Sequence, residues 1–212
     1  MMASLTLAPV GLTSCLILLG LLGLRHATDP DHLAAVSQLL VLDPQGVRRA
    51  HLLSLAWGCG HGLVVMLAAL PVVLGLVSWP QWIGPVADRM IGLMLILIAA
   101  RLLWVWRKSR AQDHSHTTAP RSLPASFGIG AMHGLAGTGA ISVLMLAAIP
   151  NRSAALEGLL VFSLTTMLGM VLIARGLGPL LIGRSQAQRM WSVPVLACCS
   201  AAVGLMLAVS NG

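Results

Sequence analysis

Several stretches of this chain are apolar over the length needed to cross a lipid bilayer. A spanning helix needs roughly 20 predominantly apolar residues. Five such stretches are clear, separated by Pro, Gly and charge: 52–77, 91–106, 127–149, 155–173 and 193–209. The chain is 57% hydrophobic and 9% charged, whereas soluble domains carry roughly 25% charged residues. We therefore predict an all-α integral membrane protein.

The basic residues are scattered over the sequence. There are 13 Lys and Arg against 6 Asp and Glu, a formal charge of +7, and only 4% of residues are aromatic. A nucleic-acid-binding protein gathers its basic residues on one face. Here they flank apolar stretches, a distribution that favours a lipid bilayer and argues against nucleic acid as a partner.

The two halves of the sequence resemble each other. A displacement of 107 residues aligns Gly23 with Gly130 and His26 with His133. It also aligns 16–42 with 123–149, which adds a sixth span at the beginning of the chain. Three spans per half place the halves in opposite orientations, as in the inverted repeats of transporters. The expected organisation is a single transmembrane domain, 1–212, with repeat one at about 10–106, a cytoplasmic loop at about 107–122 and repeat two at about 123–210. Chance similarity between Gly- and Leu-rich helices is the alternative.

Basic residues predict the orientation of the spans. Nine of them fall on one side of the six-span arrangement: Arg48, Arg49, Arg107, Lys108, Arg110, Arg121, Arg175, Arg184 and Arg189. Only Arg89 and Arg152 flank the opposite connections. Because loops rich in Lys and Arg stay in the cytoplasm, both termini are expected outside.

Ionisable side chains interrupt the first apolar stretch. His26, Asp31 and His32 lie within it, and His61 and His133 lie within later spans. An Asp at the centre of a spanning helix costs roughly 2.5–3.5 kcal/mol on insertion scales, so such residues mark functional sites. We predict that these five residues form one intramembrane site.

A straight helix would separate these side chains. At about 100° per residue, the side chains of His26 and His32 would point in different directions. Pro30 cannot donate a backbone hydrogen bond, and it biases Asp29 away from helical dihedral angles. Asp29 fits an N-cap, with Pro30 in the first helical position. We therefore predict a break at 28–30.

Imidazole nitrogen combined with carboxylate oxygen suits a divalent first-row metal such as nickel or cobalt, and zinc and copper remain alternatives. Calcium requires more oxygen ligands, and magnesium rarely binds histidine. The competing interpretations are a proton relay and a buried ion pair between Arg25 and Asp29. Cys59 is interpreted as a packing residue, and His114 and His116 as solvated loop residues.

The segment 25–32 resembles the signature of the nickel/cobalt transporter family, Arg-His-Ala-x-Asp-Ala-Asp-His, with Pro30 in place of the Ala. The segment 54–65 resembles the next family motif more loosely. Residues 133–140 resemble the second-half motif of the short, urease-accessory-type branch. The acidic Asp-Thr-Ala-Thr-Glu stretch of the family has no counterpart here, which is in keeping with a divergent short branch.

The resemblance implies a membrane transporter of Ni²⁺ or Co²⁺ that acts by alternating access. The metal is then a substrate held by His26, Asp31, His32, His61 and His133, with no prosthetic group and no enzymatic activity. The alternatives are a membrane metallochaperone or assembly factor, and a transporter of protons or small solutes. A bacterial inner membrane is the expected location. Partners beyond the metal ion and the bilayer are a second copy of the chain or metalloenzyme maturation proteins.

Overall fold

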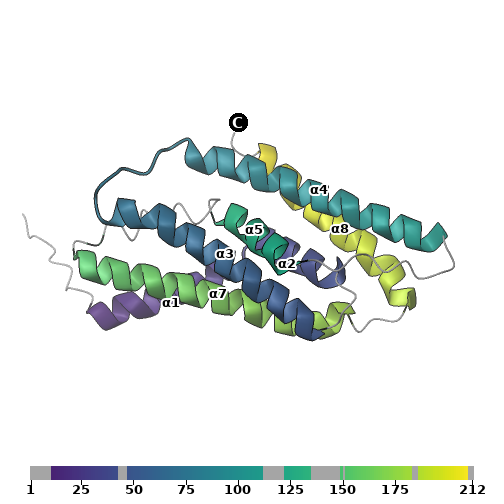
Figure 1. Ribbon diagram of the computed structural model, residues 1–212, viewed down its shortest axis with the longest axis horizontal. Coiled ribbons are helices and arrows are strands. Elements are labelled where there is room, and N and C mark those ends of the chain that lie inside the picture. The colour runs from purple at the N-terminus through teal and green to yellow at the C-terminus, as the bar shows by residue number, and fades with distance from the viewer. Residues whose placement is uncertain are drawn as a thin grey trace, which may run out of the picture.

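A computed structural model describes residues 11–42, 47–111, 122–134, 149, 151–182 and 186–209. Within these ranges the chain is helical and contains no strand, which confirms the predicted all-α class. The helices are α1 (Leu12–Ala27), α2 (Pro30–Leu42), α3 (Val47–Val73), α4 (Ile83–Ala111), α5 (Leu123–His133), α7 (Arg152–Ile182) and α8 (Gln186–Val209). They run roughly along the long axis of the molecule (Figure 1).

The helices pack in a small number of extensive pairs. Helix α1 lies on α7, α3 lies on both α5 and α7, and α4 lies on α8. Helix α2 occupies the centre, where it contacts α7, α8, α4 and α3. Every residue from 34 to 40 is buried. A helix that is buried on all sides must be apolar around its whole circumference, and 33–42 satisfies this except at Ser37 and Gln38.

Glycines permit the closest helix contacts. A Cβ atom on Gly23 of α1 would collide with the Phe162 carbonyl oxygen of α7. A Cβ atom on Gly130 of α5 would collide with the Trp57 carbonyl oxygen of α3. Small residues at such crossings are typical of membrane helices, whose association depends on close van der Waals contact.

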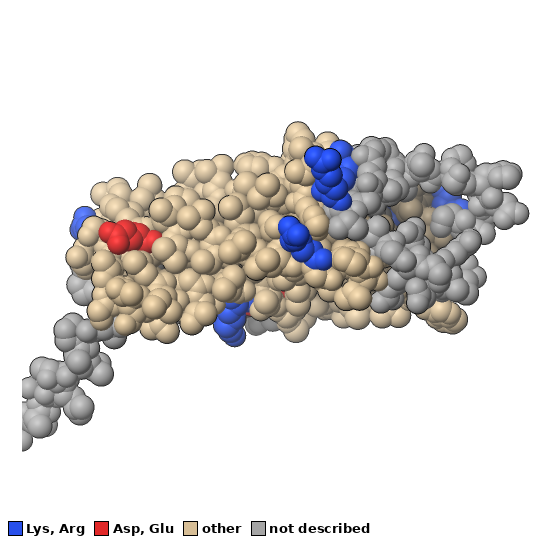
Figure 2. Space-filling view, turned by 90° about the horizontal axis from the view of Figure 1, so that it is seen from below, with Lys and Arg blue, Asp and Glu red and all other residues tan. Residues whose placement is uncertain are grey.

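The outer surface of the helices is apolar. Among its exposed side chains are Leu18, Leu67, Leu97, Leu172 and Leu205, each more than half exposed. Charged side chains are sparse on the face seen in Figure 2. In water such a surface would be an aggregation site, whereas lipid tails accept it.

By length and composition, three helices in the described residues can cross a membrane: Arg48–Val73, Arg152–Leu181 and Trp191–Val209. Leu12–Ala27 is apolar but shorter. The predicted total of six spans remains a prediction, since much of 127–149 lies outside the described residues.

The first apolar stretch is broken, as the sequence predicts. Helix α1 ends at Ala27 and α2 begins at Pro30. The Thr28 hydroxyl donates to the Arg25 carbonyl oxygen at 2.6 Å, and the Asp29 amide donates to the His26 carbonyl oxygen at 3.1 Å. Two carbonyls at the end of α1 are thereby satisfied without continuing the helix.

Candidate metal centre

Four histidines from four helices converge at the break between α1 and α2. His26 ends α1, His32 lies in the first turn of α2, His61 lies mid-way along α3 and His133 ends α5. Each is at most 3% exposed. The His32 ring is central, with its centroid 4.6 Å from that of His26, 5.0 Å from that of His61 and 5.6 Å from that of His133.

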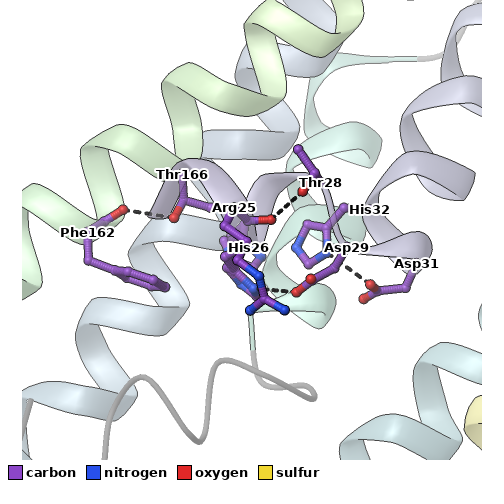
Figure 3. A network of polar contacts seen from close by, with 9 residues as sticks. Arg25, His26, Thr28, Asp29, Asp31, His32, Phe162 and Thr166 are labelled. Atoms are coloured by element: carbon purple, nitrogen blue, oxygen red, sulfur yellow. Dashed lines mark hydrogen bonds and ion pairs between the residues drawn. The ribbon is translucent and has the colours of Figure 1, made fainter. Parts of the chain in front are cut away.

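Two carboxylates hold the histidines of the broken segment. His26 Nδ1 donates to Asp29 Oδ2 at 2.9 Å, and His32 Nδ1 donates to Asp31 Oδ1 at 3.1 Å (Figure 3). Because a carboxylate oxygen accepts, each ring carries its proton on Nδ1. The Nε2 atom of each neutral ring is therefore left with a lone pair.

His133 follows the same pattern with a different acceptor. Its Nδ1 atom donates to the Ile129 carbonyl oxygen, one turn earlier in α5, at 3.3 Å. The Nε2 atoms of His133 and His32 are buried and make no hydrogen bond within the described chain. Buried polar atoms are normally satisfied, so two such nitrogens indicate a place for a ligand.

The imidazoles are close enough to share one ion. The Nε2 atoms of His26 and His61 lie 3.3 Å apart. His26, His32 and His61 each offer a nitrogen, and these three nitrogens lie within 4.8 Å of one another. Asp29, Asp31 and His32 form a second group that meets the same criterion, with both carboxylates less buried than the histidines.

Two aromatic residues enclose the cluster. The Trp57 ring lies 5.5 Å from His32 and 5.3 Å from His133, measured between centroids. Phe162 of α7 stacks on His26 at 5.5 Å. Trp57 and Phe162 are fully buried and cover part of the histidine rings. Neither residue belongs to a motif that the sequence alone would mark as functional, although Trp57 lies one helical turn before His61.

The structure thus brings together four of the five predicted ligands and places the fifth, Asp31, against His32 Nδ1. Asp29 pairs with His26, an arrangement that the sequence left undecided between a cap, an ion pair and a ligand. Cys59 is exposed, with its thiol 3.6 Å from the Met167 sulfur. His114, His116 and residues 135–140 of the second-half motif lie outside the described residues.

A helical membrane protein with buried imidazoles held by carboxylates has the features of a metal-handling protein. Residues 13–124 match the model of a family described as high-affinity nickel-transport protein, NicO. The match covers more than half of the chain, and the chain belongs to this family. The predicted family is therefore confirmed.

The chain is also similar to a curated bacterial protein. It is 29% identical over 172 residues to the urease accessory protein UreH of Bacillus sp. (strain TB-90). The similarity covers 76% of this chain and 75% of that protein. This agrees with the predicted urease-accessory-type branch. No solved structure matches the chain.

Proposed function

We propose that this protein carries Ni²⁺ across a membrane, with His26, His32 and His61 as ligands of the ion. The observation that carries the proposal is the convergence of three buried imidazoles whose nitrogens lie within 4.8 Å of one another. A first-row ion binds imidazole at about 2.0–2.1 Å, so two adjacent ligand nitrogens lie roughly 2.9–3.4 Å apart. The separation of 3.3 Å between His26 Nε2 and His61 Nε2 fits this range.

In this proposal Asp29 and Asp31 orient the ligands. Histidines that bind metals generally donate their second nitrogen to a carboxylate or carbonyl, which fixes the ring and raises its basicity. His26 and His32 have such a carboxylate, and His133 has a carbonyl. His133 is then a fourth ligand. Asp31, which the sequence predicts as a ligand, is assigned to the support of His32.

The helix packing supports the proposed pair of inverted three-helix repeats. The displacement of 107 residues relates α1 to α5, α3 to α7 and α4 to α8. A two-fold axis between the halves would convert the α1–α7 pair into the α5–α3 pair and would leave α3–α7 and α4–α8 unchanged. These four pairs are the most extensive helix contacts in the described chain. Gly23 and Gly130, which correspond under the displacement, also occupy corresponding crossings.

Transport would follow from movement of one repeat against the other around the cluster, with the ion exposed to each side in turn. The single transmembrane domain spans 1–212, with its termini outside a bacterial inner membrane. Co²⁺ is the second candidate substrate, because affinity alone separates it poorly from Ni²⁺. No enzymatic activity is proposed.

A second candidate function follows from the similarity to a urease accessory protein. A membrane accessory protein would bind nickel and give it to a metalloenzyme maturation protein without moving it across the bilayer. The histidine cluster serves either function. Flux across a sealed membrane separates the two functions.

The test uses the purified chain reconstituted into sealed lipid vesicles with a Ni²⁺-sensitive dye inside. We expect Ni²⁺ entry by the wild-type chain and none by His26→Ala, with Co²⁺ as the competing ion. Binding without flux would favour the accessory function. Wild-type flux in His26→Ala, or metal-independent proton flux, would overturn the proposal.

A further inference from the structure

One face of α4 is exposed from the first turns of the helix to its last turns. Helix α4 lies at the edge of the molecule and packs mainly on α8 (Figure 1). Its buried face includes Gly92, which lies against the Gly204 carbonyl oxygen of α8. The exposed residues of the other face recur every three or four positions, which is the spacing of a single helix face. We call them the outer stripe of α4: Val86, Met90, Leu93, Leu97, Arg101, Trp104 and Lys108.

The outer stripe changes from apolar to cationic along the helix. It is apolar from Val86 to Leu97, and its last three members are Arg101, Trp104 and Lys108. Lys108 Nζ lies 5.4 Å from the centroid of the Trp104 ring, in a cation–π contact. Arg101 precedes Trp104 by three residues, so their Cβ atoms are about 5–6 Å apart. The two cations therefore lie one turn before and one turn after an exposed indole ring.

Neither cation pairs with a carboxylate within the described residues. The carboxylates there are those of Asp29, Asp31, Asp88 and Glu157. The first two contact histidines, and Asp88 precedes Arg101 on α4 by about 19.5 Å along the axis. Glu157 lies near the start of α7 and Lys108 near the end of α4, and these two helix ends lie at opposite ends of the molecule (Figure 1). A cation on a surface that faces lipid is costly without a counterion, so these two cations require an anion from outside the described chain.

Two exposed tryptophans mark the level of the lipid head groups. Trp104 is 62% exposed, and Trp191 of α8 is 73% exposed. Helices α4 and α8 run antiparallel (Figure 1), and Leu102 and Val193 belong to one buried cluster between them. Each tryptophan is two residues further toward the same end of the molecule, so the two lie at one level. Because Trp concentrates at the membrane interface, Arg101 lies about one turn inside it and can extend its guanidinium to the head groups.

From this arrangement we propose that the outer stripe of α4 binds an anionic phospholipid. The phosphate of the lipid lies between Arg101 and Lys108, and its acyl chains run along Leu97 and Leu93. A guanidinium donates two parallel hydrogen bonds to a phosphate, whereas an ammonium acts as a compact point charge. The order of polarity along the stripe is that of a lipid, with the charged head group at the interface and the chains toward the membrane interior.

The apolar part of the stripe distinguishes a lipid from a free phosphate ion. A free phosphate would contact the two cations and would leave Leu97 and Leu93 without a partner, although both are more than half exposed. The proposal goes beyond the transport of a metal. It depends on the predicted membrane span 91–106 and not on the histidine cluster, so failure of nickel transport would leave it unchanged.

Quenching of tryptophan fluorescence by brominated lipids tests the site. The full chain is reconstituted into phosphatidylcholine vesicles that contain a small fraction of brominated phosphatidylglycerol or, in a second arm, the same fraction of brominated phosphatidylcholine. The difference between the wild-type chain and Trp104→Phe gives the quenching of Trp104. Each cation near a membrane surface enriches anionic lipid about five-fold, so we expect brominated phosphatidylglycerol to quench Trp104 at least about five-fold more efficiently. Equal quenching of Trp104 by the two lipids would overturn the proposal.

A matched pair of variants separates the site from the general positive charge of the chain. Arg101 and Arg107 are both exposed near the end of α4, but their side chains are turned about 120° from each other. We expect Arg101→Gln to lower the preference for phosphatidylglycerol about five-fold and Arg107→Gln to change it less than about two-fold. Equal losses in the two variants would show that the net charge alone attracts the lipid, and would overturn the proposal. Inorganic phosphate, added at constant ionic strength, should leave the preference unchanged, and its loss would assign the two cations to free phosphate instead.

Discussion

His26 Nε2 and His61 Nε2 lie 3.3 Å apart, although the two residues are separated by 35 positions and belong to different helices. The Asp29 carboxylate contacts His26 at Nδ1, so the Nε2 atom that faces His61 carries a lone pair. Because His26 carries its proton on Nδ1, its Nε2 atom can accept a hydrogen bond from His61 when His61 is protonated on Nε2. In the proposed function, a metal ion takes the place of this shared proton and binds both nitrogens.

The first prediction concerns these two ligands. We expect His26→Ala and His61→Ala each to weaken Ni²⁺ binding by at least about 100-fold. Removal of a residue that only orients a ligand generally lowers metal affinity by about 10–100-fold. Isothermal titration calorimetry on purified protein measures the change. Cys59→Ala is the control, since Cys59 lies two residues from His61 but is exposed. Equal affinity in wild type and His61→Ala would show that the cluster is not the nickel site.

The second prediction distinguishes a supporting carboxylate from a ligand. If Asp31 holds the His32 ring, Asp31→Asn keeps an acceptor oxygen and loses less affinity than Asp31→Ala, for which we expect a loss of about 10–100-fold. If Asp31 binds the metal directly, loss of its charge makes the two variants similarly weak. Titration of both variants with Ni²⁺ decides between these roles. Asp29→Asn and Asp29→Ala test in the same way whether Asp29 supports His26.

Much of the fold was predictable because it follows from simple constraints. The apolar stretches predicted the helical class, and Pro30 together with Asp29 predicted the position of the break between α1 and α2. The displacement of 107 residues aligns Gly23 with Gly130, and the structure places both at close backbone contacts between helices.

The details of the site were less predictable. Helix periodicity gives the direction of a side chain but not the partner of each atom. Asp31 and His32 are consecutive residues of α2, and the contact of Asp31 with His32 Nδ1 depends on side-chain rotamers that no sequence pattern specifies. The position of Trp57 beside the histidines could not be predicted either, because a Trp in an apolar helix can have many packing roles.

The third prediction concerns the helix crossing at Gly130. Gly130→Ala introduces a Cβ against the backbone of α3, and overpacking of this kind costs about 1–3 kcal/mol. Gly128→Ala, on the same helix, meets open space and is expected to be neutral or slightly stabilising. Thermal unfolding in detergent provides the comparison. Equal melting temperatures of the two variants would contradict the close approach.

The fourth prediction concerns pH. Imidazole must be unprotonated to bind a metal, so protons compete with Ni²⁺ and affinity falls as the pH is lowered. Because several histidines share the ion, we expect the fall to correspond to more than about one proton per Ni²⁺. Calorimetry in buffers of different ionisation enthalpy counts the released protons. His61→Ala should release fewer protons, and an unchanged number would remove His61 from the ligand set.

The interruption between α1 and α2 divides the ligands between two differently supported segments. His26 belongs to a helix that rests on α7, whereas His32 belongs to a helix that also contacts α8 and α4. A small shift of one segment relative to the other would lengthen the gap between their imidazoles and reduce the coordination number of the ion. Release of the metal would then need no change in protonation, because fewer imidazoles bind the ion after the backbone has moved.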